Sequence, residues 1–584
     1  MRLFAAILSC LSILLPASAF ADPAEDFAAL IADYEAHEAE RDVITRGRRG
    51  DLEAASRWPD ASFDAVAAHD QAMAGFLERL EGIDPEALPG DQAANYAVLA
   101  YLLESAAAIP ATRTALTPFT NDSGFHTRPG FVAMGTRLRT VEDAEAWIAR
   151  LEALPEYYAQ HRAWLERGLE RGITQSREIL PGVADQIEAQ ITAPEDSTLF
   201  MPLAALPGTI SDADQARLRA EALAAIENEV LPALIDLRAF FADTYMPGAR
   251  ETLGARSLPG GAAFYADLVR YHTTLDTTPE AVHERGLAEV ARIRAEMETV
   301  IAATGFDGTF AEFLQFLRTD DRFYADTEME LMMRASYLSK QADDAMPAFF
   351  NRLPRLPYGV RAVPASLAPN YTTARYWPGD AENGEAGGYL VNTYRLDQRP
   401  LYELPALTLH EAVPGHHHQI ALAQEMEDVP DFRRETYITA FGEGWGLYAE
   451  FLGYDMGFYE DPYDRFGALT YEMWRACRLV ADTGIHWYGW SREEAEACFL
   501  ENSALAPLNI TNEVSRYISW PGQALAYKTG ELLMRELRAD GEARLGADFD
   551  LADFHDTLLE EGGVPLGYLE ARVHGWIEDQ EAGR

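Results

Sequence analysis

The sequence predicts a mainly α-helical protein with one small β region, placed just before its most unusual helix. Apolar residues recur at three- and four-residue spacing through most of the 584-residue chain, as they do in amphipathic helices. Residues 354–404 instead mix aromatic and β-branched residues with Pro and Gly, which is typical of short strands and extended loops. The sequence has no βαβ alternation and no internal repeat, so neither a Rossmann fold nor a solenoid is indicated.

The first 21 residues are interpreted as a secretory signal peptide. They open with one arginine, continue with an almost unbroken apolar run from Leu3 to Leu15, and end with small-residue cleavage sites before Asp22. That run is shorter than the ~20 apolar residues of a membrane-spanning helix. A lipid attachment box around Cys10 is the alternative interpretation. We expect an exported protein, periplasmic or extracellular, without stable membrane insertion.

The mature chain is expected to form one helical domain over residues 22–584. An N-terminal helical lobe would cover about residues 22–318, and a second lobe, about residues 319–584, would contain the functional site. Helical spacing is clear in three segments of the first lobe: Ala144–Leu169, Ala213–Phe241 and Pro279–Ile301. The last of these has a proline at its first turn after two threonines, which is a good start signal for a helix.

Two segments between residues 354 and 404 are expected to be strands or extended loops, namely 371–377 and 388–394. The second contains Gly388 to Asn392. We expect it to be an edge strand on which an extended substrate lies by β-augmentation, with Asn392 among the substrate contacts. The alternative is an ordinary hairpin, because two glycines followed by β-branched residues also have that pattern.

The chain is strongly acidic, with 48 Lys and Arg against 94 Asp and Glu and a net charge of −46. Nucleic-acid binding depends on basic side chains that neutralise phosphates, so DNA and RNA are excluded as partners. With 48% apolar residues the chain has enough apolar side chains for a large core.

Outside the signal peptide the only cysteines are Cys477 and Cys498, and they either form a disulfide or are two buried thiols. Two cysteines alone do not make a zinc site.

The segment from residue 407 to 419 predicts metal chemistry, because it contains a His-Glu pair followed by three consecutive histidines. In the HExxH signature, two histidines one helical turn apart bind zinc and the glutamate is the general base on the zinc-bound water. Here Pro414 occupies the position of the second histidine. A kink at this proline and at Gly415 would bring His416 beside His410, as if two residues had been inserted into the motif. His416 is therefore the preferred second ligand and His417 the fallback, with Glu411 as the base.

A second segment, residues 440–450, places two carboxylates among small and aromatic residues. A carboxylate in such surroundings is costly to bury unless it is paired or bound to a cation. Two histidines, one glutamate and an open position form a catalytic zinc arrangement. We therefore expect Glu443 to be the third zinc ligand and Glu450 to orient a ligand histidine. The alternative is that the histidine run is simply surface.

Four blocks of the chain closely resemble the bacterial domain-of-unknown-function family 885 and occur in the expected order. They are His-Glu-Ala-Val-Pro-Gly-His-His from His410, Gly-Glu-Gly-Trp-Gly-Leu-Tyr-Ala-Glu around Glu443, Asp-Thr-Gly-Ile-His up to His486, and the segment from Arg516 to Lys528. That family resembles helical zinc peptidases such as angiotensin-converting enzyme, oligopeptidases and thermostable carboxypeptidases. The resemblance implies a two-lobed helical fold around a deep cleft, with zinc on His410, His416 and Glu443.

A metallopeptidase also needs a hydrogen-bond donor for the oxyanion of its tetrahedral intermediate. His486 and Tyr517 are the candidates, and an ordinary buried polar aromatic is the alternative for each. Four residues of the last block are expected to bind substrate, with a cation receiving the free carboxylate of a peptide; they are Arg516, Gln523, Tyr527 and Lys528. The alternative for these cations is an intramolecular salt bridge.

The sequence therefore predicts an exported zinc hydrolase of short peptides or peptide-like amides. It leaves exo- versus endo-cleavage open, and a carboxypeptidase or dipeptidyl-carboxypeptidase type is one option. We expect a monomer or homodimer whose partner is a peptide or small amide substrate. Two rivals stay open: a zinc amidase for cell-wall or modified amino-acid amides, and a non-catalytic protein that binds metal or peptide. The presence of Glu411 argues against the second rival, because metal binding alone does not need a base.

Overall fold

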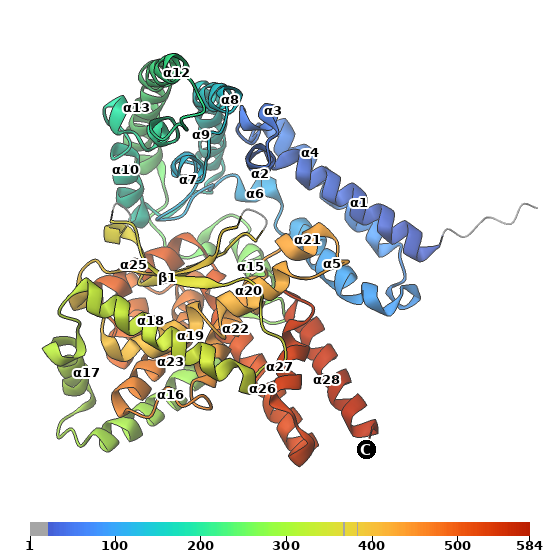
Figure 1. The fold of residues 1–584 in the computed structure, drawn as a ribbon, viewed down its shortest axis with the longest axis vertical. Helices are drawn as coiled ribbons and strands as arrows, with labels where there is room; N and C mark the ends of the chain where they lie inside the picture. The colour runs from blue at the N-terminus through green and yellow to red at the C-terminus, as the bar shows by residue number, and fades with distance from the viewer. Residues whose placement is uncertain (1–21, 366–367, 382–383, 584) are drawn as a thin grey trace, which may run out of the picture.

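The computed structural model describes residues 22–365, 368–381 and 384–583 (Figure 1). The expected signal peptide and Cys10 lie outside the described residues. The prediction of a mainly α-helical fold with a small β region is confirmed: the three strands all lie between residues 354 and 404. No helix in the described part of the chain is long and apolar enough to cross a membrane.

The first part of the chain is helical from its beginning. Its α-helices are α1 (Pro23–Arg41), α2 (Val43–Arg48), α3 (Leu52–Ala55), α4 (Phe63–Glu81), α5 (Ala93–Ala108), α6 (Ala111–Thr114), α7 (Arg128–Met134), α8 (Val141–Glu152), α9 (Leu154–Arg171), α10 (Leu180–Glu188), α11 (Met201–Ala204), α12 (Asp212–Ala225), α13 (Leu231–Phe240), α14 (Met246–Gly248) and α15 (Gly261–Thr273). Figure 1 shows α7 to α13 gathered into a lobe above the sheet. The segment 144–169 divides into α8 and α9 because Pro155 starts a new first turn.

The second part of the chain forms the larger body. Its α-helices are α16 (Pro279–Thr304), α17 (Phe310–Thr319), α18 (Glu328–Ala345), α19 (Leu404–Glu411), α20 (His416–Gln424), α21 (Asp431–Glu435), α22 (Thr439–Leu452), α23 (Pro462–Thr483), α24 (Arg492–Asn502), α25 (Pro507–Ser519), α26 (Ala526–Leu545), α27 (Leu551–Leu559) and α28 (Leu566–Ala582). The start of α16 agrees with the sequence: the Thr278 side chain accepts a hydrogen bond from the Ala281 N–H, with Pro279 in the first turn.

The core of the body is built from long helices that pack in pairs, α16 with α23 and α22 with α26. The second pair approaches closely because two glycines face each other. A Cβ atom added to Gly444 would lie only 2.6 Å from the Gly530 Cα atom. A disulfide between Cys477 and Cys498 joins α23 to α24, which resolves the choice between a disulfide and two thiols. Such a link restricts the unfolded chain and is found mainly in exported proteins.

The sheet contains β1 (Tyr358–Ala362), β2 (Ala374–Trp377) and β3 (Gly387–Val391), in the order β1-β3-β2. β3 pairs parallel with β1, Gly387 opposite Tyr358, and antiparallel with β2, Tyr389 opposite Tyr376. The prediction of an edge strand at 388–392 is therefore wrong, because β3 is central and has a neighbour on each side. The strand with a free edge beside α19 is β2.

Candidate metal centre

The first part of the site is the end of α19, where His410 and Glu411 are buried with 3% and 8% of their surface exposed. The His410 ring fits there because the facing residue of α22, Gly446, has no side chain. A Cβ atom at residue 446 would lie 2.7 Å from His410 Cε1 and about as close to both ring nitrogens. The small residues that the sequence places in α22 are therefore required for the imidazole to reach its position.

The helix breaks directly after Glu411, where the sequence has Pro414 and Gly415, and α20 begins at His416. The Val413–Pro414 peptide bond is cis, and the Gly415 N–H donates to the Leu409 carbonyl oxygen at 2.9 Å. No side chain fits at residue 415, since a Cβ atom there would lie 1.9 Å from the His410 carbonyl oxygen. On the opposite side, the indole N–H of Trp445 donates to the Pro414 carbonyl oxygen at 2.7 Å and holds the turn in place.

This turn brings His416 beside His410, with ring centroids 4.6 Å apart and planes nearly perpendicular. Glu443 of α22 completes the group: its Oε2 atom lies 3.5 Å from His410 Nε2 and 3.4 Å from His416 Nε2. Zinc bonds of about 2.0–2.2 Å at tetrahedral angles require donor atoms about 3.4 Å apart. Glu443 thus lies at the spacing that a tetrahedral zinc ion needs from both histidines, and all three donor atoms lie within 4.8 Å of one another.

The charges in this group favour a cation. Burial alone would lower the pKa of His410, but the carboxylates of Glu443 and Glu450 outweigh it and raise that pKa to about 10. Burial alone would likewise raise the pKa of Glu443, yet His416 and His410 hold it well below its usual range. In the metal-free chain the carboxylates of Glu443 and Glu450 therefore favour the protonated, positively charged form of His410. A bound divalent ion would supply that charge directly.

Glu450 lies two turns after Glu443 on α22 and supports His410 from the rear. Its Oε1 atom is 2.8 Å from His410 Nδ1, and the Arg475 guanidinium lies 3.3 Å from the same oxygen. A carboxylate at the far nitrogen of a ligand histidine fixes the tautomer and the ring orientation. The expected orienting role of Glu450 agrees with this contact, which directs Nε2 of His410 towards Glu443.

The carboxylate of Glu411 is held at the edge of the sheet, beside the ligand group. Its Oε2 atom accepts a hydrogen bond from the Tyr376 backbone N–H at 2.6 Å. Tyr376 belongs to β2, and in its pairing with β3 this N–H points away from the sheet. The free edge of β2 therefore positions the carboxylate that the sequence assigns as general base.

His417 lies on the other side of α20 and is not part of the group. Its Nδ1 atom shares a hydrogen bond with the Tyr376 hydroxyl at 2.9 Å, and its ring packs 4.5 Å from that of Tyr358. Burial lowers the pKa of His417 to about 4, which keeps the ring neutral at physiological pH. The fallback assignment of His417 as a ligand is not supported by this geometry, because its contacts direct the ring towards the sheet.

The two expected oxyanion donors have no free polar atom to offer. His486 is fully buried: its Nδ1 accepts from the Ala255 N–H at 2.9 Å, and its Nε2 donates to the Tyr517 carbonyl oxygen at 2.9 Å. The Tyr517 hydroxyl donates to Glu513 at 2.8 Å and accepts from Arg478 at 3.0 Å. Both assignments are therefore corrected: His486 and Tyr517 are structural hydrogen-bonding residues between helices.

Three of the expected substrate-binding residues do lie together. The Arg516 guanidinium donates to the side chains of Gln523 and Tyr527, and it also lies 3.3 Å from Glu513. Asn392 is different, because it is fully buried and its amide donates to the backbone carbonyls of three residues, 368, 371 and 372. Asn392 therefore shapes the loop before β2 and is not available to a substrate.

Lys528 is likewise corrected. It is fully buried, and its ammonium lies 2.6 Å from Glu531, 2.8 Å from Glu472 and 3.3 Å from Glu289. Burial alone would lower the pKa of Lys528, but these three carboxylates raise it. The intramolecular salt bridge, the alternative considered from the sequence, is what the structure contains.

This burial leads to a prediction for stability. Lys528→Met should destabilise the fold by up to about 3–5 kcal/mol, because it removes the cation that three carboxylates share and leaves them only Arg292 and Arg535. Urea unfolding followed by circular dichroism measures the change. As a control, Lys340→Met should change stability by less than about 1 kcal/mol, since the Lys340 side chain is 81% exposed in its ion pair. Equal effects of the two substitutions would contradict the buried network.

One residue near the ligand group was not identified from the sequence. Tyr437 precedes α22, 47% of the residue's surface is exposed, and its hydroxyl end lies against Gly442. Burial of that end and the negative charge of Glu443 raise the pKa of Tyr437 well above its usual value. Tyr437 therefore stays protonated and has a hydroxyl to donate beside the ligands. No local pattern marks it, because its position depends on the turn between α21 and α22.

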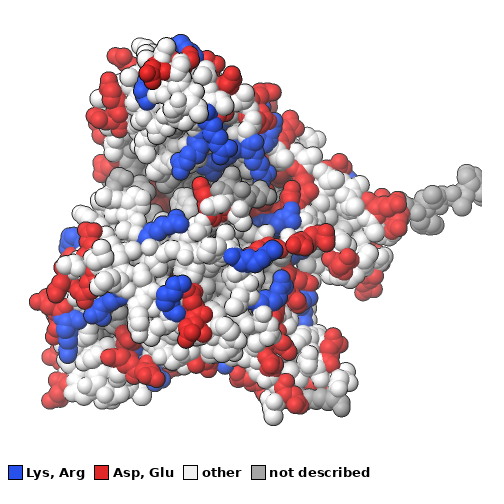
Figure 2. Space-filling model, in the orientation of Figure 1, with Lys and Arg blue, Asp and Glu red and all other residues white. Residues whose placement is uncertain are grey.

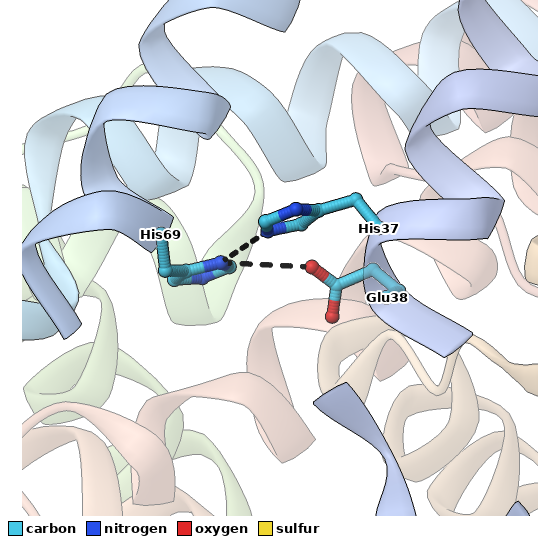
Figure 3. A group of neighbouring side chains, drawn as sticks. All are labelled: His37, Glu38 and His69. Atoms are coloured by element: carbon cyan, nitrogen blue, oxygen red, sulfur yellow. Dashed lines mark hydrogen bonds and ion pairs between the residues drawn. The ribbon is translucent and has the colours of Figure 1, made fainter. Parts of the chain in front are cut away.

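A second His-Glu group lies on α1 and α4, far from the first in sequence (Figure 3). It contains His37, Glu38 and His69, with His37 Nε2 3.1 Å from His69 Nδ1 and Glu38 Oε1 3.7 Å from the same atom. The guanidinium of Arg41 already lies 2.7 Å from His69 Nδ1, and the Glu38 side chain is 40% exposed. A positive group thus already occupies this cluster, and we base the candidate metal centre on the group around Glu443.

Comparison with known proteins connects this site to a family. The family described as "Bacterial protein of unknown function (DUF885)" matches residues 44–573. A solved structure described as a candidate lipoprotein from Colwellia psychrerythraea covers 95% of this chain and 100% of its own, with a TM-score of 0.89 and 26% identity. A candidate lipoprotein of unknown function from Shewanella oneidensis covers 93% of this chain and 99% of its own, with a TM-score of 0.73 and 18% identity, which shows the fold alone. No curated protein matches the chain in sequence.

Proposed function

This chain belongs to the DUF885 family of bacterial proteins, and from that premise we propose that it is a zinc-dependent hydrolase of short peptides or peptide-like amides. The observation that supports the proposal most directly is the spacing of the three donor atoms of His410, His416 and Glu443. Glu411 adjoins the first of these ligands, as a general base must if it is to reach a water molecule at the same centre.

The residues present suit zinc. Two imidazole nitrogens and one carboxylate oxygen, with a fourth position left open, are the donor set of catalytic zinc. Calcium and magnesium prefer sets made of oxygen atoms alone, so they fit less well. A zinc ion held by His410, His416 and Glu443 would supply Lewis acidity to the reaction.

The protein residues then have distinct roles. Glu411 removes a proton from the attacking water and passes it to the leaving amine, and its position is fixed by the Tyr376 N–H. Tyr437 is the hydroxyl donor that we assign to the developing oxyanion in place of His486 and Tyr517. Glu450 keeps His410 in the orientation that its role as a ligand requires.

The group of Arg516, Gln523 and Tyr527 is the part of the site that we assign to substrate binding. Tyr527 is among the groups that raise the pKa of Tyr437, after burial and Glu443, which links this group to the proposed oxyanion donor. Arg516 keeps 18% of its side chain exposed. A guanidinium in this place can receive the carboxylate at the end of a short peptide.

We also propose that the protein is exported, to the periplasm or beyond. The interpretation of residues 1–21 as a signal peptide, the Cys477–Cys498 disulfide and the description of both structural neighbours as candidate lipoproteins support this location.

The test combines metal analysis with product mapping. We expect the purified chain to contain about one zinc per molecule and to cleave members of a mixed short-peptide library, as detected by mass spectrometry. Dialysis against a chelator should abolish cleavage, and added zinc should restore it. A metal-loaded chain that releases no product from any peptide or amide in the library would contradict the proposal.

A further inference from the structure

We propose that four arginines of the N-terminal lobe form an anion-binding surface that selects acidic peptides for the site below it. We call this surface the arginine patch; it consists of Arg48, Arg128, Arg137 and Arg139. The inference rests on the proposed function in one respect, since it takes the substrate to be a peptide.

The first observation is that these arginines are unpaired. All four are exposed, and within the described part of the chain none of their guanidinium groups makes a hydrogen bond or a salt bridge. Elsewhere an arginine typically contacts one or more carboxylates: Arg217 and Arg538 each contact at least two. In a chain of net charge −46, guanidinium groups that contact no carboxylate need a reason.

The second observation is that the four residues come from neighbouring segments of the lobe. Arg48 is the last residue of α2, and its guanidinium lies against Gly135, where an added Cβ atom would be 2.6 Å from Nη2. Arg137 and Arg139 follow in the link from α7 to α8, and Arg128 begins α7. The positive charge of Arg48 also acts on the neighbouring Arg150. Burial, and after it the charge of Arg48, lower the pKa of Arg150 to about 10.

Two contacts join this part of the lobe to the walls of the site. Next to Arg48, the Arg49 guanidinium lies 3.1 Å from Glu435, which ends α21 two residues before Tyr437. A few residues before α7, the Asn121 N–H donates to the Ser519 hydroxyl at 3.0 Å, and Ser519 follows Arg516 in the last turn of α25.

One of these contacts thus leads from the lobe to the segment before the proposed oxyanion donor, and the other leads to the substrate-binding group. Figure 2 shows basic side chains on the underside of the upper lobe, overhanging a hollow above the larger body. A ligand that enters this hollow from the viewed face passes beneath them.

The chemistry of the surface indicates the ligand. Guanidinium groups bind carboxylates through paired hydrogen bonds, and an overhanging wall of one charge concentrates oppositely charged ligands. The single carboxylate at the C-terminus of a peptide would not require four arginines. α7 is about 10 Å long, which corresponds to about three residues of an extended peptide. The patch therefore suits a peptide with several acidic side chains.

The test measures binding separately from cleavage. Fluorescence anisotropy would follow two labelled peptides, hexaglutamate and hexaglutamine, on the Glu411→Gln chain in 50 mM salt. We expect hexaglutamate to bind at least tenfold more tightly, and the preference to decrease as salt rises. The triple variant Arg128→Gln, Arg137→Gln, Arg139→Gln should lose that preference. A control with the same change in charge elsewhere, Arg162→Gln, Arg238→Gln, Arg285→Gln, should keep it.

Equal binding of the two peptides, or an unchanged preference in the patch variant, would overturn the inference. Circular dichroism shows whether each variant is folded, and exposed positions tolerate such changes. The outcome is separable from the proposed function. If acidic peptide binds through the patch but the wild-type chain cleaves nothing, the hydrolase is contradicted and the patch is supported. If peptides are cleaved with no preference for acidic sequences, the patch is contradicted and the hydrolase is supported.

Discussion

Glu411→Gln is expected to retain about one zinc per chain and to lose peptide cleavage by about 10²–10⁴-fold. Glutamine keeps the shape of the side chain and can still accept the hydrogen bond from the Tyr376 N–H, so the fold should not change. It cannot accept a proton from the attacking water, which is the role that we assign to Glu411. Metal analysis and steady-state kinetics on the same preparation measure both quantities.

The control for this substitution is Glu427→Gln. Glu427 lies in the exposed loop after α20, and the same change there should alter neither zinc content nor the rate. If Glu411→Gln cleaved peptides at the rate of the wild-type chain, Glu411 would not be the base and the mechanism would be wrong.

His416→Ala is expected to release the metal and abolish cleavage, whereas His417→Ala should keep the metal. The first change removes one of the three donor atoms. Loss of a residue that only orients a ligand lowers metal affinity by about 10- to 100-fold, so loss of a ligand itself should lower zinc affinity by more than that. The second removes a hydrogen bond to Tyr376 on the far side of α20 and leaves the three donors in place. Zinc content after gel filtration and a competitive chelator titration compare the two variants.

These neighbouring histidines form a matched pair, since both are buried and both lie in the first turn of α20. A general loss of stability would therefore affect the two variants alike, and thermal unfolding measures that loss directly. Loss of zinc from the His417 variant, with zinc kept by the His416 variant, would place the ligand one residue further along the helix.

Features that depend on neighbouring residues could be predicted from the sequence. The start of α16 follows from a threonine cap and a proline at Pro279. The preference for His416 as the second ligand, with His417 as the fallback, follows from Pro414 and Gly415, because both residues disrupt a helix. The strand region was likewise visible as a change of composition before α19. Each of these signals lies within a few residues of the feature that it predicts.

Features that depend on distant partners could not be predicted. Lys528 looked available because its three carboxylates are spread along the chain, the most distant at Glu289. His486 looked like a donor, but its partner Ala255 is 231 residues away. The edge of the sheet was placed on the wrong strand because strand order is not encoded in any single strand. Tyr437 has no sequence signal of its own, since only tertiary packing places it beside Glu443.

The role of α22 has a consequence for how this protein can vary. Within two turns this helix supplies Glu443 as a ligand, Trp445 as the donor to the Pro414 turn, Gly446 as the space for the His410 ring, and Glu450 as its support. Inserting one residue after Glu443 would rotate the other three by about 100° around the helix axis. Relatives that keep this centre should therefore differ by substitution in α22 and by insertion only outside it.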